Sequence, residues 1–447
     1  MLLEKLIKEN EPSIKKTLES LSEIAVNLKF IKGLHRVYQY SDEPKIYQYS
    51  ASISLTEKQT DGDLNVSNRG GGSSFFSKEE AFLKCFCESI ERHACTIYKR
   101  NGLITGSYQK YKKSALNLDS VAGFSNEQKK SMYFERTNFT QQTQFSWISG
   151  YSLKGYQTLI PAQLVYFNYK LNPEEAMLYV PMSTGAAGGG CLSSAITRGI
   201  LEIVERDAFI IYYLNKLPGY KVNLKSIPDK RIRLILQTLK RYKLEAHVID
   251  ITTDLCIPSF LSIVIDRTQI GPAIQMGLKS ALNPIDAIVN SLQEAVHVRN
   301  WARQVHEDEY KENITIDPIN IKTIKERAMF WYKTEMLKYL DFWLNQEETS
   351  LRHESLFINT YSGKELNLLN EIFNKNKYSV YYVDLTLPQL EKSGYKVVKV
   401  IIPQLQPFYL HERYKCLGGK RLHEVPPKMG YPMKKSEELN QLPHPFL

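Results

Sequence analysis

The amino-acid sequence predicts a fold of the mixed α/β class with α+β character. Three observations support this prediction: a glycine-rich segment precedes a helix pattern twice, strand-like runs separate these helices, and a third helix pattern follows further strands. The hydrophobic fraction of 43% is enough for a substantial core, and the charged fraction of 24% is ordinary for a soluble globular protein. No stretch between residues 60 and 405 has the composition of a flexible linker, so we expect one large unit there.

The first hundred residues are expected to pass from helix to strands and back to helix. Residues 1–30 have a helical pattern, with an apolar face formed by Leu2, Leu3, Leu6 and Ile7. Residues 36–58 show the alternation that is typical of strands. A polar, glycine-rich loop over residues 67–74 then leads into a helix over residues 77–99, which begins with the capping-box pattern Ser-Lys-Glu-Glu.

The middle of the chain repeats this order of elements. Residues 140–182 mix aromatic and β-branched residues with turn formers, which favours strands. A second glycine-rich loop, over residues 183–190, precedes a second helix over residues 193–214. Residues 245–280 contain further runs that are typical of strands.

A third helix is expected between Asn283 and about Val305. Asparagine suits the N-cap, the proline that follows it suits the first helical position, and Asp286 lies near the positive end of the helix dipole. Residues 316–346 are expected to be helical again, and residues 355–405 to hold further strands and a helix. The remaining C-terminal residues are rich in proline and are expected to be irregular.

The composition limits the classes of partner. The formal net charge of +10 indicates either an ordinary solvated surface or a field that attracts polyanions, such as nucleotides or an acidic leader peptide. The positive charge is not concentrated in one run, so a nucleic-acid partner is not expected. Six cysteines without paired Cys-x-x-Cys spacing predict neither a structural zinc site nor a disulfide scaffold, and a reducing cytoplasm fits best.

Targeting and nucleotide-loop patterns are also absent from the sequence. The N-terminus alternates charged and apolar residues and lacks the uninterrupted apolar stretch of a signal peptide. No run approaches the ~18 apolar residues of a membrane span, so no membrane partner is expected and the cytoplasm is the predicted location. Neither glycine-rich segment matches a Walker A pattern, and no Gly-x-Gly-x-x-Gly follows a strand.

Acidic residues recur on the three otherwise apolar helices. The first helix carries Glu88 and Glu91, and because they are three residues apart their carboxylates share one face. The second helix repeats this spacing with Glu202 and Glu205, and the third carries Glu294. Further polar residues lie on the same helices, and an arginine directly follows the second glutamate twice: Lys84, Arg92, Arg198, Arg206, His297 and Arg299.

This combination of residue types suits a magnesium–phosphate site. Carboxylates on apolar helices tend to be buried and then need a cation, and Mg²⁺ prefers oxygen ligands from carboxylates and phosphates. Arginine binds phosphate oxygens bidentately, and glycine before a helix lets backbone N–H groups approach a phosphate. Each signal has an ordinary alternative, since a lone Glu-x-x-Glu-Arg is usually a solvated face, a triple glycine is usually a turn, and a lone His297 is usually structural.

Taken together, the three glutamate segments resemble motifs of the YcaO family. The matching segments are residues 86–92, residues 183–189 followed by 199–208, and residues 293–299. Their order and rough spacing agree with the family over about residues 60–420. The resemblance implies a YcaO-type fold with ATP in a central cleft lined by the glutamate-bearing helices.

The resemblance also implies ATP and Mg²⁺ as cofactors and assigns residues to them. In the family these glutamates hold Mg²⁺ against the phosphates, a role carried here to Glu88, Glu91, Glu202, Glu205 and Glu294. The candidate nucleotide contacts are Lys84, Arg92, Arg198, Arg206 and Arg299, with Ser67, Arg69 and Gly71 from the glycine-rich segment. The chain departs from the family where Lys84-Cys85 replaces a frequent Ser-Ala and His297 replaces a frequent Gln, but every glutamate remains, so ATP use is expected.

The C-terminus resembles the proline-rich tail of the azoline-forming members of the family. Leu447 stands where that tail has a final proline. In that group the tail reaches the active site, so Pro443, Pro445 and Leu447 are candidate catalytic residues together with His297. The alternative is a disordered tail that contains two prolines.

The function implied by the resemblance is cyclodehydration of a ribosomally made peptide. A Cys, Ser or Thr side chain would attack the preceding amide carbonyl, the amide oxygen would take the γ-phosphoryl group of ATP, and loss of phosphate would leave a thiazoline or oxazoline. His297 and the carboxylate of Leu447 are the candidate proton acceptors. The alternatives are thioamide or amidine formation by the same ATP site, and a non-catalytic nucleotide-binding scaffold, which would not need five inward carboxylates.

The same resemblance predicts the organisation of the chain and its partners. We expect an N-terminal helix and strands over residues 1–60, a catalytic domain over residues 61–420 and a tail over residues 421–447 that reaches the active site. Because only about 60 residues precede the family region, a separate partner of the E1-like (ThiF-like) type is expected to bind the leader of the precursor peptide. A flavin dehydrogenase and a second copy of the chain are further candidate partners.

Overall fold

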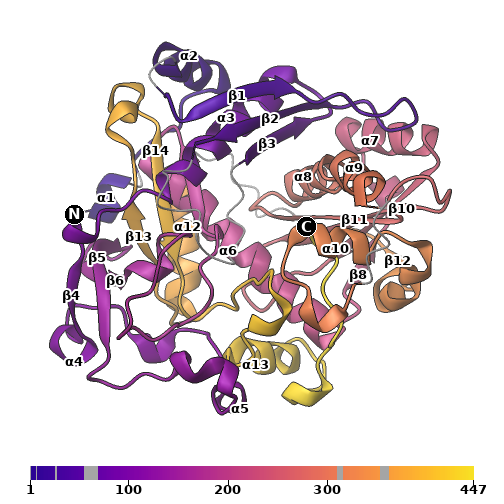
Figure 1. Cartoon of the computed structure of the whole chain (residues 1–447). Coiled ribbons are helices and arrows are strands. Elements are labelled where there is room, and N and C mark those ends of the chain that lie inside the picture. The colour runs from indigo at the N-terminus through magenta and orange to yellow at the C-terminus, as the bar shows by residue number, and fades with distance from the viewer. Residues whose placement is uncertain (1, 7, 26–27, 55–68, 310–315, 353–361) are drawn as a thin grey trace.

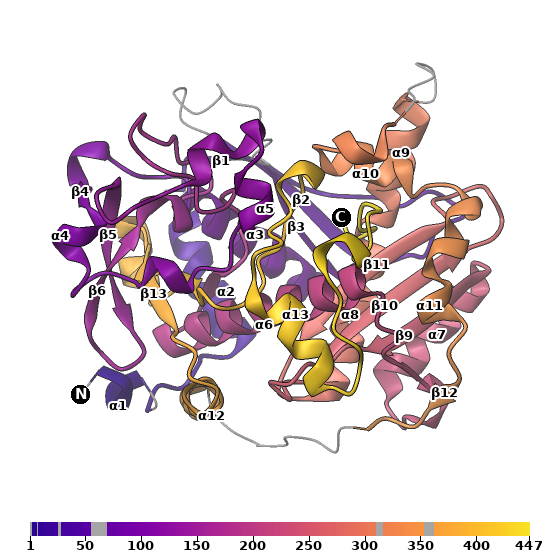
Figure 2. The same cartoon turned by 90° about the horizontal axis from the view of Figure 1, so that it is seen from below.

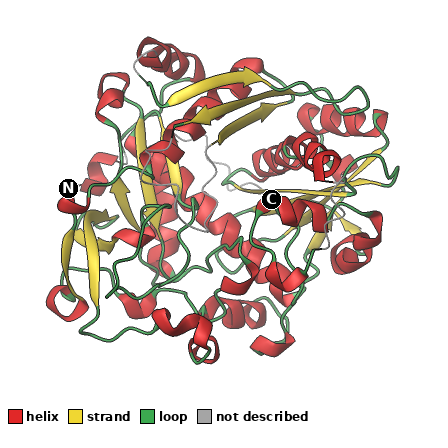
Figure 3. Ribbon diagram, viewed as in Figure 1, coloured by secondary structure: helices red, strands yellow, loops and turns green. Residues whose placement is uncertain are grey.

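Helices and strands are interspersed along the described part of the chain. The computed structural model describes residues 2–6, 8–25, 28–54, 69–309, 316–352 and 362–447 (Figure 1). Within these residues the strands form three sheets, and helices lie between and around them (Figure 3). The mixed fold predicted from the sequence is therefore confirmed.

The first sheet is antiparallel and has the order β1 (Ile31–Arg36), β2 (Tyr47–Ile53) and β3 (Arg69–Ser74). Helix α3 (Lys78–Ala94) packs against β3. The loop predicted for residues 67–74 is wrong in its described part, because residues 69–74 are this edge strand. The glycines serve close packing rather than a turn: a Cβ on Gly72 would lie 2.2 Å from the carbonyl oxygen of Ala81 in α3.

We expect Gly72→Ala to destabilise the protein strongly. The added methyl group would overlap backbone atoms of α3, at 2.2 Å from Ala81 O and 2.3 Å from Cys85 N, which no rotamer change can relieve. Overpacking of this kind costs about 3 kcal/mol, and thermal unfolding followed by circular dichroism measures the loss. Gly33→Ala is the matched control, because Gly33 lies in the same sheet and its Cβ would meet nothing within 4 Å. Equal losses in the two variants would contradict this account of β3.

Helix α3 begins where the sequence predicts and ends earlier. Its N-cap, Ser77, accepts a hydrogen bond of 3.1 Å from the backbone N–H of Glu80. The Glu80 side chain binds Lys84 at 2.6 Å instead of returning to the N-cap, so one half of the predicted capping box forms. The helix ends at Ala94, five residues before the predicted end.

The second sheet gathers strands from distant parts of the sequence, in the order β4–β5–β13–β14–β7, with β6 also paired to β5. These strands are β4 (Ile104–Ser107), β5 (Gln144–Ser152), β6 (Gln157–Pro161), β7 (Ala186–Gly189), β13 (Tyr381–Asp384) and β14 (Lys396–Ile401). The loop predicted for residues 183–190 is thus wrong in its second half, which is the edge strand β7. A Cβ on Gly188 would lie 2.0 Å from Tyr395 Oη, so glycine again permits a close approach.

The third sheet has the order β11–β10–β9–β8–β12, and β12 is parallel to β8. Its strands are β8 (Tyr220–Val222), β9 (Leu244–Asp250), β10 (Ser259–Asp266), β11 (Ile274–Ser280) and β12 (Glu348–Thr349). Helices α7 (Lys230–Arg241) and α8 (Pro284–His297) cover one face. Strand β10 is buried on both faces, which explains its continuous apolar sequence and confirms the strands predicted over residues 245–280.

Helix α6 (Leu192–Asn215) joins the second sheet to the third. Its first half, with Ile196 and Ile200, packs in one core with β14, and its second half, residues 208–214, packs in another core under the third sheet. Besides Arg198 in its second turn, the charged residues of this helix lie where it passes from one sheet to the other: Glu202, Glu205, Arg206 and Asp207. A long apolar helix therefore carries most of its charges at the junction of two sheets.

Two helices predicted from the sequence are shorter than expected. Asn283 caps α8 as predicted, accepting hydrogen bonds from two backbone N–H groups, but the helix stops at His297 and α9 (Arg299–Glu309) follows. Residues 316–346, expected to be helical, form only short pieces: α10 (Ile324–Phe330), α11 (Asp341–Leu344) and two 3₁₀ segments. The break after α10 places Trp331 in the core, where it is 2% exposed.

The remaining helices lie at the two ends of the chain and on the surface: α1 (Leu2–Leu6), α2 (Ile14–Ala25), α4 (Tyr108–Tyr111), α5 (Asn126–Lys129), α12 (Ser362–Lys375) and α13 (Lys420–Lys428). The prediction of irregular structure after residue 405 misses α13, which contains Pro426 and Pro427 in its last turn. The C-terminal segment runs between the second and third sheets (Figure 2). In the described part of the chain no helix is both long enough and apolar enough to span a bilayer.

Candidate functional site

Glutamates from three helices bind the edge strands of the three sheets. Strands β3, β7 and β11 each lie at a sheet edge, where outward backbone N–H groups have no neighbouring strand. A glutamate carboxylate accepts hydrogen bonds from these groups or from the residue directly before the strand. The bonds are Gly71 N to Glu88 at 2.6 Å, Gly188 N to Glu91 at 2.9 Å, Gly185 N to Glu202 at 2.8 Å, Ser280 N to Glu205 at 3.2 Å, and Leu278 N to Glu294 at 2.7 Å.

These bonds connect the three strand–helix units in a ring. The first glutamate of each helix binds the strand that precedes its own helix. The second glutamate binds the next unit, since Glu91 of α3 reaches β7 and Glu205 of α6 reaches β11. Helix α8 has no second glutamate, and its Gln293 accepts the N–H of Phe75, just beyond β3, at 3.0 Å. The five glutamates that the sequence predicts as metal ligands therefore belong to one connected arrangement.

His297 takes the place of a second glutamate on α8. It lies three residues after Glu294, and a Cβ on Gly71 would be 2.9 Å from its Nε2 atom, so the imidazole lies against β3. Burial lowers the pKa of His297, while the nearby Glu88 opposes this shift. A neutral imidazole is the form that can accept a proton.

Two arginines lie among the carboxylates. Arg206 Nη1 is 3.2 Å from Glu205 Oε1, and its Nη2 is 4.0 Å from both Glu202 Oε1 and Glu294 Oε1. Arg92 donates from Nε to Glu88 Oε1 at 2.8 Å. Because Arg206 contacts carboxylates of both α6 and α8, it links two of the three helices.

Burial acts against the charged form of the ring carboxylates. Burial, followed by the charge of Glu88, raises the pKa of Glu91 to about 7. Burial also raises the pKa values of Glu202, Glu205 and Glu294, although Arg206 acts in the opposite direction on each. A bound cation would favour the charged form of these partly buried carboxylates.

The donor set fits Mg²⁺ together with a phosphorylated ligand. Every acidic donor is a carboxylate oxygen, the type that Mg²⁺ prefers, and Mg²⁺ in proteins usually takes only one or two carboxylates and completes its coordination with phosphate and water. Within the described residues no three acidic, His or Cys side chains lie close enough to hold one ion by themselves, because the carboxylates are spread over three strand edges. Nη1 of Arg206 is buried and forms an ion pair with Glu205 but no aligned hydrogen bond, and a phosphate oxygen would supply that acceptor.

The other predicted nucleotide contacts pair with protein groups outside the five glutamates or are exposed, where the structure describes them. Lys84, one turn before Glu88, pairs with Glu80 at 2.6 Å. Arg198 donates to the carbonyl oxygen of Gly188 at 2.8 Å and pairs with Glu11 at 2.8 Å. Arg69 is exposed at the start of β3, and Ser67 lies outside the described residues.

Arg299 is not brought to the ring. Its guanidinium is buried, binds Glu43 at 2.5 Å and Asp266, and donates to the carbonyl oxygen of Pro272 at 2.8 Å. All three of its nitrogens are used, so the predicted phosphate contact does not fit this position. The sequence predicts one helix that carries both Glu294 and Arg299. In the structure α8 ends at His297, and Arg299 begins α9 and lies away from the ring.

We expect Arg299→Gln to lower stability without changing the KM for ATP. The substitution leaves Asp266 buried without its cation and Glu43 with only Arg303 at 3.5 Å, a loss of about 3–5 kcal/mol that thermal unfolding measures. Arg231→Gln is the control, because its pairs with Asp229 and Asp286 are half exposed and contribute about 1 kcal/mol or less. A tenfold rise in KM at unchanged melting temperature would instead support a contact with nucleotide.

The C-terminal tail lies against the ring. Phe446 is buried and its ring centroid is 4.3 Å from the guanidinium carbon of Arg206. The carbonyl oxygen of Pro443 accepts hydrogen bonds from Tyr213 at 2.8 Å and Trp331 at 3.0 Å. Pro443 and Pro445 are buried and Leu447 is half-buried, so the disordered alternative for the tail is excluded.

Several neighbours of the ring carry no signal in the sequence. Tyr395 donates its hydroxyl to Glu91 Oε1 at 3.1 Å, and Lys279 Nζ is 3.7 Å from Glu205 Oε2. Both come from strands or turns whose sequence is ordinary. Lys399 is buried in β14 and donates to the carbonyl oxygens of Met182 and Thr184 at 2.6 and 2.7 Å, directly before Gly185. Lys399 could have been noticed in the sequence, because a lysine within a strand of β-branched residues is unusual.

Comparison with known proteins gives a family match and shared folds. Residues 70–406 match the family described as YcaO cyclodehydratase, ATP- and Mg²⁺-binding. A heterocyclase in complex with substrate and cofactor has a TM-score of 0.79 at 20% identity; the match covers 96% of this chain and 57% of the heterocyclase. This chain thus spans a little over half of that protein.

Two further solved structures share the fold. The YcaO protein of Methanopyrus kandleri, bound with AMPPCP and Mg²⁺, has a TM-score of 0.59 at 15% identity, and the match covers 88% of this chain and 92% of that one. The Escherichia coli microcin synthetase McbBCD complex has a TM-score of 0.52 at 16% identity, covering 83% of this chain and 87% of that one. At these identities the similarity shows the fold.

Proposed function

Because the chain belongs to the YcaO family of ATP- and Mg²⁺-binding cyclodehydratases, we propose that it forms thiazoline or oxazoline rings in a precursor peptide. The substrate residues would be Cys, Ser or Thr, whose side chains attack the preceding backbone amide. The products would be the ring, ADP and phosphate. The proposal gives this chain a substrate class and a ring chemistry in addition to the ATP and Mg²⁺ binding of its family.

The observation that carries the proposal is the ring of five glutamates, three of which lie beside Arg206. The carboxylates would hold Mg²⁺, and Nη1 of Arg206 would bind a phosphate oxygen. A scaffold that only binds a partner would not need partly buried carboxylates such as Glu91 and Glu202, whose pKa values burial raises. We therefore favour catalysis over the scaffold alternative.

The reaction needs a leaving group, a proton acceptor and charge stabilisation. Mg-ATP supplies the phosphoryl group that turns the amide oxygen, a poor leaving group, into phosphate. Arg206 would stabilise the negative charge that develops on the transferring group. We propose two candidate proton acceptors. The first is the neutral imidazole of His297, which lies against β3 in the ring. The second is the carboxylate of Leu447, the residue after Phe446, whose ring contacts Arg206.

The position of the tail favours azoline formation over thioamide or amidine formation. Phe446 covers Arg206, so the last residues of the chain would lie beside the reacting groups. We also propose that a partner protein presents the leader of the peptide, with an E1-like protein and a flavin dehydrogenase as candidates. The McbBCD complex is a multi-protein synthetase with this fold, which supports an assembly of that kind.

The test is an intact-mass measurement on the peptide and partner encoded beside this chain, incubated with the purified protein and Mg-ATP. Loss of one water per modified residue, with release of phosphate, is the expected result. Exchange of oxygen for sulfur would identify a thioamide instead. An unchanged peptide mass without phosphate release, when the partner is shown to bind, would refute catalysis and favour the scaffold.

A further inference from the structure

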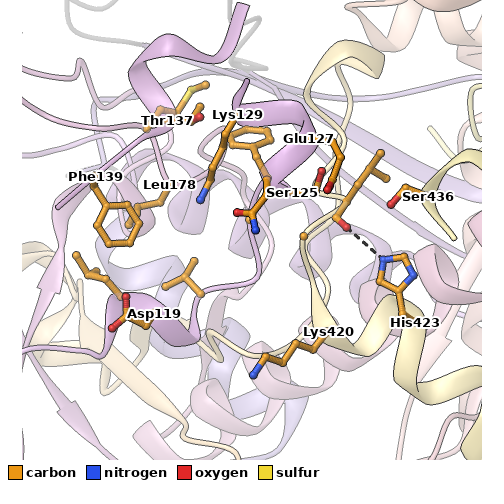
Figure 4. Close-up of a pocket in the computed structure, with 18 of the residues that line it drawn as sticks. Asp119, Ser125, Glu127, Lys129, Thr137, Phe139, Leu178, Lys420, His423 and Ser436 are labelled. Atoms are coloured by element: carbon orange, nitrogen blue, oxygen red, sulfur yellow. Dashed lines mark hydrogen bonds between the residues drawn. The ribbon is translucent and has the colours of Figure 1, made fainter. Parts of the chain in front are cut away.

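A cavity of about 690 Å³ lies away from the glutamate ring, between the segment that contains α5 and the segment that contains α13 (Figure 4). None of the site residues predicted from the sequence lines it. Its volume is within the range of about 300–1,000 Å³ that ligand sites occupy. The cavity is therefore large enough to bind a few residues of a peptide.

The wall of the cavity is part apolar and part polar, and its charges are mixed. Phe124, Phe139 and Leu178 contribute apolar surface, and Phe139 and Leu178 lie together on one side (Figure 4). The charged residues are three carboxylates and two ammonium groups: Asp119, Glu127, Glu424, Lys129 and Lys420. This excess of negative charge, in a protein of net charge +10, disfavours a nucleotide or another anion.

Two of these charged groups have no partner in the described structure. Lys420 and Glu424 are four residues apart on α13, a spacing at which ion pairs form, yet neither has an ion-pair partner among the described residues. His423, between them, is already used: its Nδ1 is 2.9 Å from the carbonyl oxygen of Lys434 and its Nε2 is 3.3 Å from that of Leu417. Glu424 and Lys420 are thus available to a ligand, whereas His423 holds the wall in place.

Both walls connect to the ring. On one wall, Leu178 lies four residues before Met182, whose carbonyl oxygen accepts a hydrogen bond from Lys399. The chain then reaches Gly185, whose N–H donates to Glu202. On the opposite wall, Arg421 follows Lys420 and binds Asp207 of α6 through hydrogen bonds of 2.7 to 3.1 Å. Asp207 is the residue after Arg206. A ligand in the cavity would therefore lie against segments that position Glu202 and Arg206.

We propose that this cavity binds a segment of the substrate peptide that carries an apolar side chain and is neutral or basic. The apolar part of the wall would take the side chain, and the carboxylates of Asp119, Glu127 and Glu424 would attract the basic residue. The proposal rests on the proposed function in that it assigns the occupant to the peptide that the ring modifies.

Binding is measured with probes that cannot react. Acetyl-Lys-Leu-Lys-Phe-amide and acetyl-Glu-Leu-Glu-Phe-amide contain no Cys, Ser or Thr, and calorimetric titration of the full-length protein gives their Kd values. The test variant is Glu127→Lys/Glu424→Lys, both exposed positions. The matched control, Glu23→Lys/Glu347→Lys, makes the same charge change at exposed positions elsewhere.

We expect the basic peptide to bind the wild-type protein and the control equally, and the test variant at least about tenfold more weakly. The acidic peptide should bind the wild-type protein more weakly than the basic one. Equal Kd values for the basic peptide in test and control variants, or no binding to the wild-type protein, would overturn the inference. If the double variant fails to fold, Glu424→Lys alone gives the comparison. Binding as expected without any water loss in the mass experiment would refute the proposed reaction while the peptide site stands.

Discussion

Glu202→Gln is expected to abolish ring formation and to lower phosphate release at least about 100-fold. The glutamine keeps an oxygen that can accept the N–H of Gly185, so the edge of β7 stays bonded, but the negative charge next to Arg206 is lost. A neutral amide is a poor ligand for Mg²⁺ in a site that needs carboxylates. Phosphate release is measured by a coupled assay, and melting temperature checks the fold.

The control for this substitution is Glu371→Gln on the exposed side of α12, which removes the same charge far from the ring. We expect it to leave phosphate release unchanged. Wild-type activity in Glu202→Gln would show that the ring of glutamates does not hold the metal. Unfolding of Glu202→Gln would instead show that its charge is needed for the junction between the second and third sheets.

Removal of residues 443–447 is expected to have the second largest effect, again at least about 100-fold on ring formation. The truncation uncovers Arg206 by removing Phe446, and it takes away the carbonyl acceptor of Tyr213 and Trp331. It also removes the carbonyl oxygen of His444, which accepts from Arg327 at 2.6 Å. We therefore expect a lower melting temperature together with the loss of activity.

A milder change separates these two effects. Addition of one glycine after Leu447 leaves every buried contact of Pro443 and Phe446 in place but moves the terminal carboxylate. If that carboxylate accepts a proton in the reaction, ring formation falls while the melting temperature stays that of the wild type. Full activity of the extended protein would exclude the terminal carboxylate and leave His297 as the proposed acceptor.

Local patterns predicted the helices well, because their signals lie within a few residues. Ser77 and Asn283 cap α3 and α8 as their side chains suggest. The ends were less predictable, since tertiary contacts decide them: Arg299 is drawn into its ion pairs with Glu43 and Asp266, and the predicted third helix breaks there. No local pattern encodes a partner that lies 256 residues away in the sequence.

The glycine-rich segments were predicted as loops, although much of each forms a strand. Glycine is a turn former by default, and so Gly70 to Gly72 were predicted as a loop. In the structure these residues form β3, because a helix packs so closely on the strand that any Cβ would overlap it. The five glutamates were found because carboxylates on apolar helices are unusual, but the strand amides that they bind could not be predicted before the sheets were known. The roles of these residues with Mg²⁺ and ATP stay predictions.

The sharing of five carboxylates among three sheet edges makes ligand binding and folding parts of one equilibrium. A ligand that binds only the assembled ring stabilises all three sheets at once, by about 2.7 kcal/mol when its concentration is 100 times Kd. The amide protons of Gly71, Gly188 and Ser280 report on this coupling, because glutamates of α3 hold the first two and a glutamate of α6 holds the third. Their hydrogen–deuterium exchange should slow together when Mg-ATP is added, although the three residues lie in different sheets.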